Sequence, residues 1–140
     1  MIDVDGKLLD SWQELIDGTI SVPAYKGGSV PEDWSGNYVE YYVETGFSDD
    51  TKHSFRNEVV VITNIVTRFN LAIDHSKVHG IDNEIKTKVK STPGVHNLIP
   101  QTGMQILDVK FSTGDTLEEY EAGKKYYRKI VRYTHKIVQT

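Results

Sequence analysis

Two histidines and an aspartate stand at helical spacing in the second half of the chain. His75 and His79 are four residues apart, and Asp82 follows three residues later. On a helix this spacing can direct two imidazoles at one metal ion. The residues between the histidines are Ser, Lys and Val, so the general-base glutamate of the zinc-protease motif is missing. The apolar pattern also turns the histidines toward solvent, and we interpret them as solvated helix residues that bind no metal.

Two acidic clusters are the other candidates for chemistry. Asp49-Asp50 and Glu118-Glu119-Tyr120-Glu121 could pair carboxylates for acid–base work, but no nucleophile accompanies them. The chain has no Cys, no phosphate-binding glycine pattern and no nucleophile elbow. We therefore predict a protein that is not an enzyme and that holds no cofactor or metal. The clusters are interpreted as loop surface that faces solvent or another subunit.

Charge is distributed unevenly along the chain. The net charge is −4, with 16 Lys and Arg against 20 Asp and Glu. From Lys124 onward the sequence holds six basic residues and no acidic one, so ten basic residues accompany all the acids in the rest of the chain. Such a separation indicates a partner of opposite charge, either within the fold or on another molecule. The acidic bulk argues against nucleic acid as the main ligand. No apolar run is long enough for a membrane span.

The first element expected is an amphipathic helix over residues 4–20. Leu8, Trp12 and Ile16 recur at helical spacing, and polar residues take the opposite face. Gly18 is a suitable residue for the end of this helix.

Two strands are expected in the middle of the chain, after a loop rich in Pro and Gly with a short extended piece near residues 22–25. Residues 38–44 alternate apolar and acidic side chains, which predicts a half-buried strand. Residues 58–69 are β-branched almost throughout and apolar on both faces at first, which predicts a long central strand. A polar connection separates the two strands.

A second helix is expected to start at Asp74 and to end at residues 91–94. Its apolar stripe consists of Val78, Ile81, Ile85 and Val89.

The end of the chain predicts two more strands. In residues 103–112 we expect Leu107, Val109 and Phe111 on the buried face. Residues 113–124 are predicted to be a polar connection. Residues 125–139 predict a terminal strand that is apolar on one face. Its apolar face carries Tyr127, Val131, Tyr133 and Ile137, and its basic face carries Arg128, Arg132 and Lys136.

This order of elements defines the expected fold class. It predicts one α+β domain over residues 1–140, with a mainly antiparallel sheet of about four strands and two helices packed on one face. A long β-hairpin is expected at the C-terminus. The predicted strands 58–69 and 125–139 are roughly twice the usual length of ~5–6 residues, as in hairpins that reach a neighbouring subunit.

The texture of nearly the whole chain resembles the tail terminator (tail completion) proteins of long-tailed bacteriophages and phage-like particles. The resemblance rests on an N-terminal amphipathic helix, a Pro-containing loop, alternating strands, a polar loop and a closing basic hairpin. In chain order these are Leu8–Ile16, Val22-Pro-Ala-Tyr25 with Val30-Pro-Glu32, Tyr38–Glu44, Asp49-Asp-Thr-Lys-His-Ser-Phe55, the strand from Glu58, and Tyr127-Arg-Lys-Ile-Val-Arg-Tyr133. The loop at residues 27–37 is longer than this pattern.

The resemblance implies a structural virion protein. It would form a ring, usually hexameric, that caps the tail tube, ends its polymerisation and joins the tail to the head. Its partners would be copies of itself, the tail tube protein and a head–tail connector or head completion protein, with DNA passing only transiently through the lumen. It would reside in the virion at the head-proximal end of the tail, and in the host cytoplasm during assembly.

Contacts with other subunits or with the tube are predicted for charged and aromatic residues of the polar loop and the closing hairpin. These are Asp49, Asp50, Phe55, Arg56, Glu118, Glu119, Tyr126, Arg128, Arg132 and Lys136. Two alternatives stay open. One is another connector or neck ring protein of the virion, and the other is a small nucleic-acid-binding module that uses the basic terminal strand.

Overall fold

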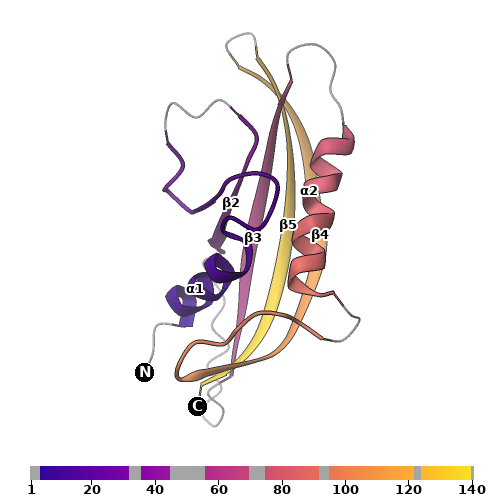
Figure 1. Cartoon of the computed structure of the whole chain (residues 1–140). Helices are drawn as coiled ribbons and strands as arrows, with labels where there is room; N and C mark the ends of the chain where they lie inside the picture. The colour runs from indigo at the N-terminus through magenta and orange to yellow at the C-terminus, as the bar shows by residue number, and fades with distance from the viewer. Residues whose placement is uncertain are drawn as a thin grey trace.

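The computed structural model describes residues 4–31, 36–44, 56–69, 75–91, 95–121 and 124–139. In these ranges two helices and five strands form an α+β fold, as predicted (Figure 1). The elements are α1 (Val4–Ile16), β1 (Ala24–Lys26), β2 (Tyr38–Val43), β3 (Arg56–Phe69), α2 (His75–Val89), β4 (Met104–Glu121) and β5 (Lys124–Gln139).

The described strands form one mixed sheet in the order β1-β2-β3-β5-β4. The sheet is larger than the four strands predicted, because the short segment near Tyr25 is a strand that pairs parallel to β2. All other neighbours are antiparallel. A Cβ on Gly27 would lie 2.8 Å from Cβ of Tyr42, so only glycine fits where the chain leaves β1. The prediction of pairing between consecutive strands missed this crossover.

Helix α1 is amphipathic as predicted but shorter. Leu8, Trp12 and Ile16 are fully buried. The helix ends at Ile16 rather than at residue 20, and Gly18 follows with a φ of 72°, a left-handed conformation that glycine adopts without strain. The Thr19 hydroxyl donates to the Leu15 carbonyl at 2.7 Å and closes the last turn.

Both helices pack on the same face of the sheet. Trp12 of α1 contacts the rings of Tyr133 and His135 on β5, and Asp82 of α2 binds Lys129 on the same strand. These β5 residues have odd numbers, and alternate residues of a strand share a face. Figure 1 shows α2 lying along the long central strands. One hydrophobic cluster fills the space between the helices and this face.

Strand β4 is much longer than predicted. Residues 113–121, interpreted from the sequence as part of a polar connection, continue β4 and pair with β5 as far as Glu121 and Lys124. The prediction was wrong because this part of the strand packs under no helix. A strand outside the core needs no apolar alternation, so its sequence carries no period-two signal.

The predicted burial of β4 was only partly correct. Val109 is fully buried, but Leu107 is 46% exposed and Phe111 43% exposed. The register with β5 shifts between Ile106 and Asp108, so Leu107 is the extra residue of a bulge, where the alternation of faces is interrupted. Phe111 lies on the terminal strand of the sheet, where it leans on Tyr133 and the Lys86 ammonium.

Candidate functional site: the β4–β5 hairpin

The outer part of the β4–β5 hairpin stands outside the hydrophobic core. The two strands pair from Met104 and Gln139 to Glu121 and Lys124. Beyond Val109, none of the described β4 side chains is buried. In the described sheet β4 is also the terminal strand, with β5 as its neighbour. This arm presents one flank and much of its side-chain surface to solvent.

Exposed apolar side chains gather on this arm and on the segment that leads into it. Among the described residues, the exposed large hydrophobic side chains are Val95, Ile99, Leu107, Phe111 and Leu117. Three of them lie on β4 and the other two just precede it. Isolated exposed hydrophobic residues are ordinary, but a group on one edge is typical of a contact surface.

On the face without helices, the strand register builds two transverse rows. Tyr38, Val66, Arg128 and Leu117 form the first row, from β2 to β4. Tyr42, Ile62, Arg132 and Ser112 form the second. Val66 and Ile62 are only 1% and 5% exposed although no helix lies on this face. Long Arg stems and Tyr rings beside them are of the right kind to shield them.

Two ion pairs hold the arginines of these rows. Arg128 Nε donates to Glu119 Oε2 at 3.0 Å, and Arg132 Nε lies 3.5 Å from Glu44 Oε2. Burial raises the pKa of the Tyr38 phenol, and the positive charge of Arg128 opposes that effect. The acid–base separation seen in the sequence is therefore partly balanced within the fold, across the hairpin and from β5 to the end of β2.

The structure brings six of the ten predicted contact residues onto the hairpin. Glu119, Tyr126 and Arg128 lie together, because Glu119 is opposite Tyr126 in the register and bonds to Arg128. Glu118 and Lys136 are exposed. The sixth is Arg132. Arg56 begins β3 opposite Val138, and nothing further is described of its side chain. Asp49, Asp50 and Phe55 lie outside the described residues.

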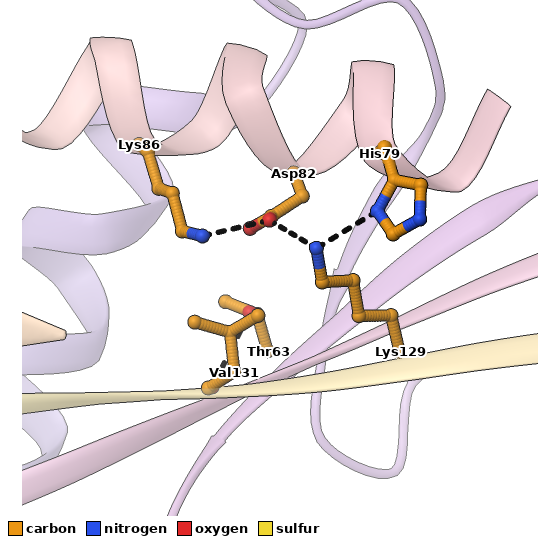
Figure 2. Close-up of polar contacts among 6 residues, drawn as sticks. All are labelled: Thr63, His79, Asp82, Lys86, Lys129 and Val131. Carbon is orange, nitrogen blue, oxygen red and sulfur yellow. Dashed lines mark hydrogen bonds and ion pairs between the residues drawn. The ribbon is translucent and has the colours of Figure 1, made fainter. Parts of the chain in front are cut away.

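A buried polar cluster ties α2 to β5, and Figure 2 shows its members. Asp82 Oδ2 accepts from Lys129 Nζ at 2.7 Å and from Lys86 Nζ at 2.8 Å. Lys129 Nζ also lies 3.0 Å from His79 Nδ1. An ammonium has donors only, so His79 accepts through Nδ1 and carries its proton on Nε2. The side chains of Asp82 and Lys129 are 2% and 8% exposed.

The sequence analysis missed this cluster. It treated His79 as a solvated residue, and His79 is exposed, but its ring bonds to a buried lysine. Lys129 shares the odd-numbered face with Tyr127 and Val131, so strict period-two reading of β5 would have located it in the core. In the described part of the chain, no group of three or more potential ligands is placed to hold a metal ion. His75 lies at the start of α2, and its side chain is not among those described.

A second buried polar group lies under α1. Trp12 Nε1 donates to His135 Nε2 at 3.0 Å, and His135 Nδ1 lies 3.0 Å from the Val59 carbonyl oxygen. Burial lowers the pKa of His135 to about 4. The imidazole is therefore neutral at physiological pH and satisfied on both nitrogens, which is a structural role.

A surface hollow of about 420 Å³ lies beside α2. It is lined by residues that include Ser21, Asn37, Lys77 and Glu84. Glu84 Oε2 already accepts from the backbone N–H and the hydroxyl of Ser21, at 3.0 and 2.9 Å. These bonds attach the loop before β1 to α2, so the carboxylate has a structural use here.

Comparisons with known proteins leave the chain without a relative. No protein-family model matches it, and a search of curated proteins gave no significant match. Among the described helices, neither is long and apolar enough to cross a membrane.

Proposed function

We propose that this chain is a non-enzymatic structural protein of a phage or phage-like virion, and that it forms the terminator ring of the tail. The ring caps the tail tube, stops addition of tube subunits and presents a surface to the head. The class of protein is taken from the resemblance of the sequence to tail terminator proteins.

The observation that carries this proposal is the β4–β5 hairpin. Its β4 strand continues beyond the core from Lys110 to Glu121, where the sequence holds four acids after Ser112 and no basic residue. Its β5 strand holds six basic residues and no acid. An arm with few core contacts costs conformational entropy to order, so a binding role explains its length better than stability does.

Ring closure requires a heterologous contact, in which one surface of each copy meets a different surface of the next copy. Charged side chains of both signs on one arm favour such a head-to-tail contact and disfavour contact between like surfaces. The exposed apolar residues Leu107, Phe111 and Leu117 supply area that becomes buried in the contact.

A nucleic-acid-binding module is the weaker candidate. Affinity for phosphates depends on cations that release counterions on binding. On β5, Arg128 and Arg132 face Glu119 and Glu44 within the same chain, and Lys129 is buried against Asp82. Half of the six basic residues of the terminal strand are thus engaged with carboxylates.

Capping of tail tubes tests the proposal. The chain is mixed with polymerising tail tube protein from the same particle, and tube lengths and tube ends are imaged by electron microscopy. We expect shorter tubes with a ring at one end only. Tubes that grow to the same length without a ring, together with salt-sensitive DNA binding by the chain, would instead support the nucleic-acid module.

A further inference from the structure

Strand β4 offers an edge that can pair with another strand. It extends over 18 residues at the end of the described sheet. An edge strand exposes backbone N–H and C=O groups that serve as a template for pairing with another chain. Which strand would pair with it depends on the side chains along β4.

The two halves of β4 differ in charge. The first half contains Lys110 and runs beside the basic last turn of α2, where Lys86 Nζ lies 5.2 Å from the centre of the Phe111 ring. The second half contains Glu118 and Glu119. Within the described residues, Lys110 forms no ion pair. A strand that is basic in one half and acidic in the other is complementary to itself in the antiparallel sense.

The faces also match. Lys110 and Ser112 are opposite Thr134 and Arg132 of β5. Leu117 is opposite Arg128, on the same face of β5 because both β5 partners have even numbers. The register shift between Thr113 and Thr116 thus moves the odd-numbered residues of the second half to the face that the even-numbered residues take in the first half.

Glu119 lies on this same face, opposite Tyr126. Its side chain is 42% exposed, and a carboxylate can accept from a second cation while it binds Arg128.

We propose that the free protein forms a two-fold dimer by antiparallel pairing of β4 with β4 of a second copy. Lys110 lies opposite Glu119 of the second copy, and Ser112 lies opposite Leu117. On the other face Phe111 lies opposite Glu118 of the second copy, which brings that carboxylate toward Lys86. Symmetry repeats each contact, so each charge pair occurs twice.

The irregular stretch of β4 fits this arrangement. In this register the two-fold axis passes between Gly114 and Asp115, so each irregular stretch meets its own copy. Regular segments on both sides, 110–112 and 117–119, carry the pairing. The dimer does not rest on the proposed ring, since it concerns the chain before assembly. Because the dimer covers the β4 edge, it would have to open before that edge could contact a neighbour in a ring.

Sedimentation equilibrium at low ionic strength tests the dimer with charge-reversal variants. Lys110→Glu alone and Glu119→Lys alone should each raise the dimer dissociation constant by about tenfold or more, since each creates two like-charge contacts. The double variant K110E/E119K should return it to within about threefold of the natural protein, although Arg128 then faces a lysine. Lys7→Glu and Asp17→Lys on and just after α1 are matched controls that should leave it unchanged.

The remaining outcomes are decisive in the other direction. A chain that stays monomeric at every accessible concentration would overturn the dimer. A dimer that weakens no more with K110E than with K7E, or that the double variant fails to restore, would do the same. A ring of higher mass that is unaffected by K110E would overturn this pairing while supporting the ring. Circular dichroism of each variant confirms that it is folded before its mass is compared.

Discussion

The indole N–H of Trp12 donates to Nε2 of His135 at 3.0 Å, across 123 positions of sequence. Indole has a donor only, so His135 must accept through Nε2 and keep its proton on Nδ1, which donates to the Val59 carbonyl. Both rings are fully buried. This bond joins α1 to the two central strands at once and fixes the tautomer of the histidine.

Stability should fall as the pH drops from about 6.5 toward 4. Burial lowers the pKa of folded His135 to about 4, while an unfolded histidine titrates near 6.5. In this window the unfolded chain binds the extra proton, so acid favours unfolding by up to about 1.4 kcal/mol per pH unit. Above pH 6.5 this contribution is fully present and constant.

Nuclear magnetic resonance separates His135 from the carboxylates that also titrate in acid. We expect the ring signals of His135 to stay in the neutral form at pH 5, while a solvent-exposed histidine titrates near 6.5. A His135 ring that is charged at pH 6 in the folded protein would contradict the assigned tautomer and its hydrogen bonds.

Removing the indole donor should destabilise the protein. Trp12→Phe leaves Nε2 of His135 buried without a partner, which costs ~1–3 kcal/mol, and the smaller ring adds a cavity. We therefore expect a loss of at least about 2 kcal/mol in the free energy of unfolding, measured by urea denaturation followed by circular dichroism. A loss below about 0.5 kcal/mol would show that the bond contributes little.

The cluster in Figure 2 should respond unequally to removal of its two central members. Asp82→Asn leaves Lys129 buried without its carboxylate, and we expect a loss of ~3–5 kcal/mol. Lys129→Met keeps the volume apolar and leaves Asp82 bound to Lys86, so its loss should be smaller. Urea denaturation of the two variants compares them directly. Equal losses would mean that packing, rather than the uncompensated charge, dominates.

Gly114 should be required for the irregular stretch of β4. A Cβ there would lie 2.6 Å from the Ile130 carbonyl oxygen, closer than real contacts allow. Gly114→Ala should therefore cost ~1–3 kcal/mol. Gly80→Ala is the matched control, because a Cβ in that part of α2 meets nothing within 4 Å and alanine favours helix by up to ~1 kcal/mol. If thermal denaturation shows no difference between the two variants, the close approach of Gly114 to β5 is not what requires glycine at this position.

The apolar periodicity of the sequence predicts the elements that contact the core. The stripe of α1 and the alternation of β5 both lead to the observed layers, because burial requires those spacings. The length of β4 could not be predicted in the same way, since its outer half makes no core contact. The three-residue strand β1 is held by backbone bonds such as Gly27 N–H to Tyr41 O, which leave no side-chain pattern.

The buried polar residues were hidden for a different reason. Lys129 and His135 occupy apolar-face positions of β5, but their residue types normally indicate surface. Only their partners on the helices, Asp82 and Trp12, make burial tolerable, and those partners are distant in sequence. The hairpin charges were visible in the sequence, whereas the pairing of Arg128 with Glu119 required the register.

The central claim is that the β4–β5 hairpin meets neighbouring copies of the same chain around a ring. Electron cryomicroscopy of the protein assembled on tail tubes, at a resolution that traces the backbone, tests it most directly. We predict a closed ring at one tube end in which the hairpin of each copy contacts the next copy. A ring whose hairpins contact no neighbouring copy, or a tube end without this chain, would contradict the claim.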